Sequence, residues 1–471
     1  MSKTRGKSME ELLKEALVPE EQQPYELPQN WVWVKLENVH DIITGSTPSK
    51  KVPQYYGGSF PIIKPGDLDQ GDSVILASEY LSEEGKAKSR IIPKNSTLVC
   101  CIGSIGKAGF TLVDCTTNQQ INSLVGIKNT VVPKYTYYFS LSESFRQALI
   151  SRSSSTTISI INKFKMGQIP FPLPAYSEQR KISDKIDSLF TKIDEAKRLI
   201  DEAKESFELR RAAILDKAFR GELTNGWRDT NINIESPQMY NEESRIVSSS
   251  IPSTWSRCRL EDVILSFKYG TSEKSDYNYS GKPVLRIPNI GDSSLLLDDL
   301  KFLPDNSESN VVADGDILII RSNGSRDLVG KCALVTKKEE NFAFASYLIR
   351  LRPSERIIPE FLLWLLRSEG IKSQFFSYAK SSTGINNINI KELSNTIIPV
   401  PPKEEQQRLL NVINELLNNE DHIIKIINSK NLSDLKESIL QKAFRGELGT
   451  NNATEESAIE LLKETLNSQK K

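Results

Sequence analysis

The stretch Leu215-Asp216-Lys217-Ala218-Phe219-Arg220-Gly221-Glu222-Leu223 occurs a second time, 225 residues further along the chain, as Leu440-Gln441-Lys442-Ala443-Phe444-Arg445-Gly446-Glu447-Leu448. Only one of the nine positions differs between the two copies. The same offset, within a few residues, aligns Leu27-Pro28-Gln29-Asn30-Trp31 with Ile251-Pro252-Ser253-Thr254-Trp255. Matches this long predict that the chain is a tandem repeat of two similar halves.

Shorter matches carry the repeat through each half. They pair Leu36-Glu37-Asn38-Val39 with Leu260-Glu261-Asp262-Val263, Pro61-Ile62-Ile63-Lys64 with Pro283-Val284-Leu285-Arg286, Gly106-Lys107 with Gly330-Lys331, and Pro172-Leu173-Pro174 with Pro399-Val400-Pro401. Between these anchors the two halves diverge freely. The repeat therefore predicts related architecture in both halves, with different residues between the anchors.

Each half begins with a segment whose pattern predicts a mixed α+β domain. Short β-rich runs such as Ser96–Cys100 and Asp316–Ile320 lie between Gly, Pro and Asn turns, and helical stretches are expected near residues 133–149 and 359–377. The proline-rich segments Ile169-Pro170-Phe171-Pro172-Leu173-Pro174 and Ile398-Pro399-Val400-Pro401-Pro402 follow. Because proline removes a backbone donor and restricts the preceding residue, these segments are expected to end regular structure and act as hinges.

A long helix is expected after each hinge. Apolar residues after the first hinge alternate steps of four and three, which is the seam of a coiled coil. They are Ile182, Ile186, Leu189, Ile193, Ala196, Ile200, Ala203, Phe207 and Ile214, interrupted by Arg210. The second half repeats the spacing at Leu409, Ile413, Leu416, Ile423 and Ile427 and then slips, because Leu435 and Ile439 fall out of phase. We therefore expect two partner helices, each about 60 Å long.

Composition limits the class of protein. The chain has 471 residues, which at roughly 150 per domain suggests about three units, or two domains with connecting helices. Lys+Arg and Asp+Glu both number 61, so any nucleic acid would have to be bound by local patches. The five cysteines form no CxxC pair, and the sequence contains neither a signal core nor a membrane span. These features favour a cytoplasmic protein without membrane contact.

Most catalytic arrangements are not favoured by the sequence. His40 and His422 lie far apart without ligand-spaced neighbours, so they are expected to be polar surface residues and no metal site is expected. Residues 103–107 lack the frame of a phosphate-binding loop and are expected to form a turn between strands. The chain also lacks the Asn-Pro-Pro-aromatic motif that methyltransferases use to hold a flipped base.

One enzymatic alternative stays open at this stage. Asp67, Glu84 and Lys86 could place two carboxylates and a lysine around a metal ion and an attacking water, as in a metal-dependent nuclease. The second half has Asn289 near the position of Asp67, however, and has no Glu-x-Lys after it.

A DNA-binding module requires only suitable donors on loops. Hydroxyl and cationic side chains suit phosphates, while arginine and asparagine pair with guanine and adenine edges. The candidates in the first half are Ser46, Thr47, Lys50, Lys51, Lys64, Lys107, Arg152, Ser154, Thr156 and Thr157. Those in the second half are Thr271, Lys274, Arg286, Arg321, Asn323, Arg326, Lys331, Ser381, Thr383, Asn386 and Asn387. The last loop has the same position in both halves, immediately before the hinge.

The order of these features resembles a known family. A globular segment, a Pro-rich hinge, Glu178-Gln179-Arg180-Lys181-Ile182 or Glu405-Gln406-Gln407-Arg408-Leu409, a long helix and Ala-Phe-Arg-Gly-Glu-Leu occur twice, as in the specificity subunit of type I restriction-modification systems. The resemblance covers essentially the whole chain. It implies two target-recognition domains that each read one half of a split, asymmetric double-stranded DNA sequence. It also implies that the two conserved helices pack antiparallel as a spacer.

The resemblance implies that catalysis belongs to partners. Two modification (methyltransferase) subunits would methylate adenine N6 with S-adenosylmethionine, and restriction/translocase subunits would use ATP and Mg²⁺ to translocate and cleave DNA. This chain would bind no cofactor itself. The repeated helix ends are the candidates for docking: Phe219, Arg220, Glu222, Phe444, Arg445 and Glu447. A coiled-coil bridging protein without a DNA role is a further alternative.

The expected segments are an N-terminal helical segment (1–26), a first target-recognition domain (27–175), a central long helix (176–224), a linker (225–250), a second target-recognition domain (251–402), a distal long helix (403–448) and a helical tail (449–471). Glu11-Leu12-Leu13-Lys14-Glu15-Ala16-Leu17 resembles Glu460-Leu461-Leu462-Lys463-Glu464-Thr465-Leu466, so the repeat is nearly circular. The linker has no clear copy of that helix, which weakens the expectation of equal docking on both sides.

Overall fold

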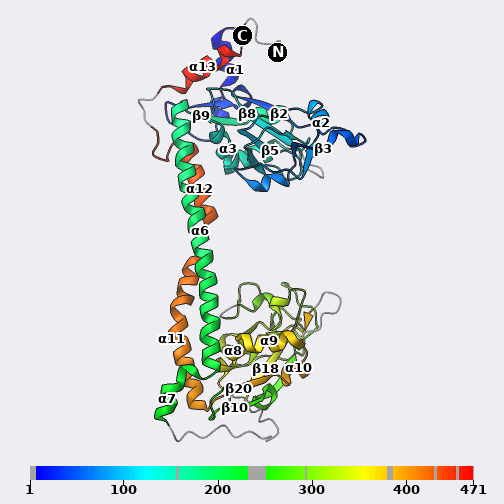
Figure 1. Cartoon of the computed structure of the whole chain (residues 1–471), viewed down its shortest axis with the longest axis vertical. Helices are drawn as coiled ribbons and strands as arrows, with labels where there is room; N and C mark the ends of the chain where they lie inside the picture. Colours follow the sequence, from blue (N-terminus) through cyan, green and yellow to red (C-terminus); the bar gives the residue numbers. More distant parts are fainter. Residues whose placement is uncertain are drawn as a thin grey trace. The chain divides into compact units, whose positions relative to one another are not determined.

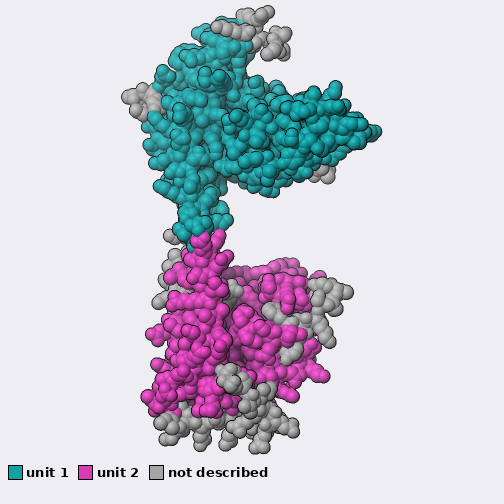
Figure 2. Space-filling view, in the orientation of Figure 1, with its two compact units in different colours: residues 1–199, 430–471 teal, residues 200–429 magenta. Residues whose placement is uncertain are grey.

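The computed structural model describes residues 7–154, 159–231, 251–291, 294–378, 386–428, 432–451 and 456–469. The chain divides into two compact units. Unit 1 comprises Met1–Leu199 and Lys430–Lys471, and unit 2 comprises Ile200–Ser429 (Figure 2). Each unit therefore combines the globular segment of one half with a helix end that belongs to the other half.

The globular part of unit 1 is built on two small sheets. The strands are β1 (Val32–Lys35), β2 (His40–Thr44), β3 (Tyr56–Ile63), β4 (Glu79–Leu81), β5 (Ser96–Cys100), β6 (Ala108–Thr111), β7 (Thr116–Thr117), β8 (Ile121–Gly126) and β9 (Pro170–Leu173). A four-stranded antiparallel sheet has the order β2-β8-β5-β6, and a three-stranded sheet has the order β4-β3-β7. β1 pairs with β9.

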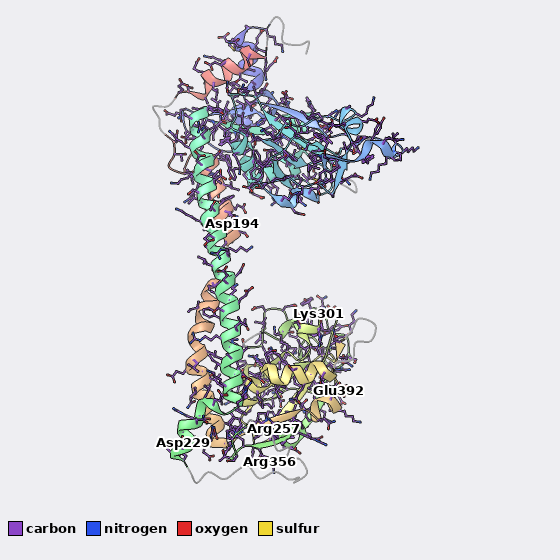
Figure 3. All side chains as sticks on the ribbon, in the orientation of Figure 1. Asp194, Asp229, Arg257, Lys301, Arg356 and Glu392 are labelled. Atoms are coloured by element: carbon purple, nitrogen blue, oxygen red, sulfur yellow. The ribbon has the colours of Figure 1, made fainter. Side chains whose placement is uncertain are left out.

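Unit 2 repeats this topology. Its strands are β10 (Ser256–Arg259), β11 (Ile264–Tyr269), β12 (Pro283–Leu285), β13 (Lys301–Phe302), β14 (Ile317–Ile320), β15 (Ser322–Asn323), β16 (Cys332–Leu334), β17 (Ala343–Phe344), β18 (Leu348–Pro353), β19 (Asn386–Asn387) and β20 (Ile397–Val400). The sheet orders β11-β18-β14-β16 and β13-β12-β17 match those of unit 1, and β10 pairs with β20. Figure 3 marks Lys301 on β13. The sequence repeat is thus also a repeat of strand order.

The helices confirm the expected pattern. Unit 1 contains α1 (Met9–Ala16), α2 (Glu83–Ala87), α3 (Pro133–Leu141), α4 (Glu143–Arg152), α5 (Lys163–Gly167), α12 (Leu432–Phe444) and α13 (Ala458–Ser468). Unit 2 contains α7 (Asn225–Thr230), α8 (Pro359–Arg367), α9 (Glu369–Tyr378), α10 (Ile390–Ser394) and α11 (Lys403–Asn428). The long helix α6 (Tyr176–Phe219) begins in unit 1 and ends in unit 2 (Figure 1). None of the helices in the described ranges is long and apolar enough to span a membrane.

The proline-rich segments form strands, which corrects the expectation that they end regular structure. β9 and β20 each lie in a two-stranded ladder, so one edge of the strand needs no partner. Leu36 N–H donates to Ile169 O, and the next hydrogen-bonded position along β9 is Phe171, so Pro172 stands where an N–H would point away from β1. Proline is tolerated at such positions because no ladder bond is lost.

The seam of α6 faces the interior as expected. Ile182, Ile186 and Ile193 are buried, whereas Leu199 and Leu209, which lie off the seam, are 51% and 74% exposed. A polar contact joins α6 to α12 in unit 1, where Lys436 on α12 donates to Asp194 on α6 at 2.6 Å (Figure 3).

The second long helix is described in two stretches. It is described as α11 and α12, and residues 429–431 between them lie outside the described residues. In unit 1 the start of α6 shares a core with the end of α12, and in unit 2 the end of α6 shares a core with the start of α11. α6 therefore runs antiparallel to its helical partner in both units.

The repeated helix ends complete each core. In unit 1, Phe444 contacts the rings of Tyr135 and Phe139, with centroid distances of 5.3 and 5.2 Å. In unit 2, Phe219 contacts Phe361 at 5.6 Å. Each phenylalanine comes from one half of the sequence and packs on the globular segment of the other half.

The first turn of each long helix is locked to the globular segment by a glutamine. Gln179 Oε1 accepts from Val132 N at 2.8 Å, and its Nε2 donates to Thr130 O and Pro174 O. Gln406 repeats this, accepting from Ile358 N at 2.8 Å and donating to two carbonyls, one of which belongs to Arg356 (Figure 3).

The two ends of the chain pack together in unit 1. α1 contacts α13, and Leu12 and Ala16 of the first helix share a core with Leu462 and Leu466 of the second. The similar N- and C-terminal sequences thus form a pair of neighbouring helices. In the linker, α7 is described and residues 232–250 lie outside the described residues.

His40 is buried, which corrects its expected surface position. Its Nδ1 lies 3.1 Å from Leu36 O, its Nε2 lies 2.7 Å from Thr136 Oγ1, and its ring packs edge-on against Phe171. Burial lowers the pKa of the imidazole from 6.5 to about 4. The side chain of His422 lies outside the described residues.

Acidification should destabilise unit 1 through His40. The unfolded chain binds this proton below about pH 6.5 and the folded chain only near pH 4, so stability present at neutral pH is lost as the pH falls between these values. We expect the unfolding free energy to drop between pH 7.5 and pH 5 by about 2 kcal/mol more in the native sequence than in His40→Gln. Urea unfolding at both pH values measures this, and equal losses in the two proteins would contradict it.

Glycine is required at the helix ends. Gly221 and Gly446 have φ of +77° and +74°, and a Cβ there would lie 2.4 Å from Pro252 Cγ or Pro28 Cγ. The turn after each helix thus closes directly on the Pro-x-x-Trp motif of the adjoining globular segment. The repeated glycine and the repeated proline therefore contact each other in both units.

Gly446→Ala should destabilise unit 1 more than Gly449→Ala. Both glycines have positive φ, but a Cβ at Gly449 meets nothing within 4 Å. We expect a loss of about 1 kcal/mol for Gly449→Ala from backbone strain alone, and of roughly 2 to 4 kcal/mol for Gly446→Ala, where overpacking adds to it. Hydrogen exchange of the β5 amides, which lie in unit 1, reports the change. Similar losses for the two variants would show that the contact with Pro28 is not tight.

Candidate nucleic-acid interface

Four segments of unit 1 meet where β2 and β5 of its larger sheet end and β8 begins. Gly45 N donates to Ile121 O at 3.0 Å, Cys101 N donates to Gln120 O at 2.7 Å, and Ile161 N donates to Cys101 O at 3.0 Å. We call residues 45–51, 101–107, 118–120 and 159–161 the loop face of unit 1. Backbone bonds fix its segments side by side, so its side chains can act together.

Unit 2 builds the same face with the same bonds. Gly270 N donates to Leu348 O at 3.4 Å, Arg321 N donates to Tyr347 O at 2.9 Å, and Ile388 N donates to Arg321 O at 2.8 Å. The loop face of unit 2 comprises residues 270–274, 321–326, 345–347 and 386–388. Its segments correspond one to one with those of unit 1.

A glycine anchors the first loop of each face. A Cβ at Gly45 would lie 2.0 Å from Asn118 O, and a Cβ at Gly270 would lie 2.2 Å from Phe344 O. Only glycine lets the loop approach the neighbouring connection so closely. Both faces therefore depend on a close approach that the sequence repeats 225 residues apart.

The structure brings several first-half candidates to this face. Thr47 Oγ1 donates to Gln119 Oε1 at 2.9 Å, Ser46 Oγ accepts from Arg90 N at 3.3 Å, and Ser154 N and O bond Ile160 O and N across a short bridge. Lys50 and Lys51 are exposed on the first loop, and Lys50 also pairs with Glu79 at 3.5 Å. That these side chains bind a ligand together stays a prediction.

Other first-half candidates are engaged elsewhere. Lys64 pairs with Glu79 at 3.0 Å, and Lys107 pairs with Asp69 at 2.8 Å, so both charges are compensated within the unit. Arg152 donates to Ala148 O at 3.3 Å, and burial lowers the pKa of its guanidinium. Thr156 and Thr157 lie outside the described residues.

Second-half candidates divide in the same way. Asn386 and Asn387 on β19 pair with Asn323 and Ser322 on β15, so the loop at 321–326 and the loop before the hinge lie side by side. Lys274 and Arg326 are exposed, Thr271 Oγ1 accepts from Glu273 N, and Lys331 is half-buried. Arg286 pairs with Asp299 at 2.9 Å, as Lys64 pairs with Glu79 in unit 1. Ser381 and Thr383 lie outside the described residues.

Arg321 organises the loop face of unit 2. Its guanidinium lies 4.7 Å from the ring centroid of Tyr269, its Nε donates to Asn387 Oδ1 at 3.3 Å, and its Nη1 donates to Ser346 O at 3.4 Å. Tyr269 and Tyr347 are 38% and 58% exposed. Sequence reasoning missed these tyrosines, because an exposed aromatic residue at a strand end cannot be distinguished from a core residue by pattern alone.

The nuclease alternative is not favoured by the arrangement of its residues. Asp67 caps a turn, since its carboxylate accepts from Lys64 N at 2.8 Å and from Ser78 N at 3.0 Å. Asn289 caps the equivalent turn by accepting from Arg286 N at 2.8 Å. Lys86 pairs with Glu83 at 3.3 Å. Within the described ranges no three His, Cys, Asp or Glu residues form a metal-binding group.

A pocket is repeated where each helix end meets a helical hairpin. The unit 1 pocket, of about 540 Å³, lies between α4 and the end of α12, and the unit 2 pocket, of about 450 Å³, lies between α9 and the end of α6. Equivalent residues line them: Leu440, Gln441, Phe444, Arg445, Ser142 and Glu143 in unit 1, and Leu215, Asp216, Phe219, Arg220, Ser368 and Glu369 in unit 2. We call them the helix-end pockets.

The helix-end pockets refine the candidates for docking. Phe219 and Phe444 are only 8% and 1% exposed, so these two candidates are core residues that also line the pockets, and docking at the helix ends stays a prediction. Arginines line both pockets: Arg152 and Arg445 in unit 1, and Arg220 and Arg257, which Figure 3 labels, in unit 2. Glu222 and Glu447 are exposed beside the helix ends but line neither pocket.

Comparisons with known proteins agree on one family. The family described as "Type I restriction modification DNA specificity domain" matches residues 28–205 and 252–430. The sequence is 27% identical over 441 residues to the EcoKI specificity subunit of a type I restriction enzyme from Escherichia coli K12, and 26% identical over 440 residues to the StySPI specificity subunit from Salmonella potsdam. In both cases the match covers 90% of each chain.

Solved structures show the same fold. A chain from a structure of a type I R-M system superimposes with a TM-score of 0.66 at 20% identity, covering 90% of this chain and all of the other. An HsdS subunit from Thermoanaerobacter tengcongensis gives a TM-score of 0.53 at 20% identity, covering 91% of this chain and all of the other.

Proposed function

This chain belongs to the type I restriction-modification DNA specificity family, and from that premise we propose that each of its two units reads one half of a split, asymmetric DNA target. The observation that carries the proposal is the loop face. It is held by the same backbone bonds in both units but presents different side chains. A constant scaffold with variable side chains is what two different half-sites require, because specificity comes from contacts with base edges.

The side chains of the loop faces suit DNA. In unit 1 the face presents hydroxyls and amides, and in unit 2 it presents Arg321 with Asn323, Asn386 and Asn387. Amides and guanidinium groups form paired hydrogen bonds with purines in the major groove. The exposed cations Lys51, Lys274 and Arg326 would contact phosphates and position the protein without selecting a sequence.

The antiparallel helices act as the spacer in this proposal. α6 has 44 residues, which corresponds to about 66 Å at 1.5 Å per residue. A rigid scaffold fixes the distance between two half-sites as a matter of geometry. The expected boundaries, with target-recognition domains at 27–175 and 251–402, remain part of the proposal.

The helix-end pockets are the proposed docking sites for two methyltransferase subunits. Two equivalent pockets, each lined by a phenylalanine and two arginines, suit two copies of one partner. Catalysis then belongs to the partners. The methyltransferase subunits would use S-adenosylmethionine, and restriction subunits would use ATP and Mg²⁺. The complex would act in the cytoplasm, where its DNA substrate lies.

Coexpression with a methyltransferase subunit should create a new bipartite methylated motif in cellular DNA. Single-molecule sequencing of adenine methylation measures this, with the methyltransferase subunit alone as the control. Replacing residues 27–175 by the equivalent segment of a relative should change one half of the motif only. If the complex assembles and no motif appears, the DNA-reading role is wrong and a bridging role is favoured.

Charge removal at one helix-end pocket should weaken one docking event. We expect Arg445→Ala to weaken binding of one methyltransferase subunit by roughly 5- to 150-fold, as for an interface arginine worth 1 to 3 kcal/mol. The complex should then contain one methyltransferase subunit at concentrations where the native complex contains two, as measured by mass from light scattering. Arg198→Ala is the matched control, because Arg198 pairs with Glu195 on α6 away from the pockets. An unchanged mass for Arg445→Ala would exclude the pocket.

A further inference from the structure

The connection between β7 and β8 corresponds to that between β17 and β18, but their residues differ. The first is Asn118-Gln119-Gln120 and the second is Ala345-Ser346-Tyr347. Their backbones are anchored alike, since Asn118 N donates to Ile63 O at 3.2 Å and Ala345 N donates to Leu285 O at 2.9 Å. The last residue of each connection also accepts the repeated bond from the loop beside it. The repeat therefore holds these backbones constant and varies only the side chains.

The connection of unit 1 presents two oriented amides. Gln119 and Gln120 are exposed. Gln119 Oε1 accepts from Thr47 Oγ1 at 2.9 Å, and Gln120 Oε1 accepts from Asn118 Nδ2 at 2.9 Å. Neither Nε2 group donates to another side chain or backbone atom in the described ranges. Each amide is thus held through its oxygen and keeps its NH₂ group available to a ligand.

An amide held in this way matches adenine. Glutamine forms a bidentate pair with adenine in the major groove, in which Nε2 donates to N7 and Oε1 accepts from the N6 amino group. A carbonyl-type oxygen accepts two hydrogen bonds, so the bond from Thr47 leaves one acceptor position on Gln119. The connection carries no cation, so it would contribute to selection rather than to phosphate binding.

We propose that Gln119 and Gln120 are specificity-determining residues, each of which selects adenine at its own position in the half-site that unit 1 reads. This inference rests on the proposed DNA-reading function. It adds a segment that loop composition alone does not single out, because three residues between two short strands look like an ordinary turn.

The corresponding residues of unit 2 have a different chemistry. Ala345, Ser346 and Tyr347 include no side-chain amide. Tyr347 is 58% exposed, and Ser346 O accepts a hydrogen bond from Arg321. This connection cannot make the bidentate amide pair with adenine. The two connections have equivalent backbone anchors but differ in the side chains that would read bases.

The test is the methylated motif made by the full chain with its methyltransferase subunit. The double variant Gln119→Ala/Gln120→Ala should lose preference at two positions of one half-site, with discrimination for adenine at each reduced by roughly 5- to 150-fold. The half-site read by unit 2 should not change, so it serves as an internal control. Gln469→Ala is the matched variant, because Gln469 is an exposed glutamine at the end of α13, outside the loop face.

A second variant keeps the test independent of folding. Gln119→Glu/Gln120→Glu preserves size but leaves only acceptors, and a carboxylate accepts from the cytosine N4 amino group. We expect a shift of preference from adenine toward cytosine at the same two positions. An unaltered motif in both double variants would overturn this inference and leave the proposed function standing. Absence of any motif from the native chain would overturn both.

Discussion

The packing of each repeated helix end on the globular segment of the other half is the contact on which the rest of the structure depends. Phe444 fills the core beside Tyr135 and Phe139, and Phe219 does the same beside Phe361. Burying an aromatic ring contributes several kcal/mol, a sizeable share of the stability of one domain. Neither half of the sequence completes a core alone, because each core includes a helix end from the other half.

A buried carboxylate reinforces this arrangement at the start of each long helix. Glu405 accepts from Thr224 Oγ1 at 2.6 Å and pairs with Arg228, which ties the segment after α6 to the first turn of α11. Glu178 accepts from Thr450 Oγ1 at 2.7 Å in the same manner. An arginine follows Thr224 in unit 2, and the sequence after Thr450 contains none. The two units therefore repeat the contact between hydroxyl and carboxylate but differ in the residues that follow it.

The loop faces separate positioning from selection. Their segments are joined by main-chain hydrogen bonds that any side chain allows, apart from the glycines at 45 and 270. Side chains on these segments can then change while the main-chain bonds between the segments are kept, because those bonds are not made by side chains. Lys64 and Arg286, which occupy matching positions in the repeat, pair with Glu79 and Asp299 within their own units. This division explains how one fold can serve two different half-sites.

Local patterns in the sequence were sufficient for the outline of the protein. The repeat, the helix seam from Ile182 onward and the strand at Ser96–Cys100 all follow from residue spacing, which acts over a few residues. Pattern alone misjudged Pro172 and His40, since each depends on a partner far away in the chain.

The loop face could be predicted only in part. Its hydroxyl and cationic loops are visible in the sequence, but the connection at 118–120 is identified only by the segments that fold against it. What the sequence by itself determined was which elements form and that they form twice. Which residues meet was decided by the tertiary structure, because contacts between distant segments depend on how cores close and not on local spacing.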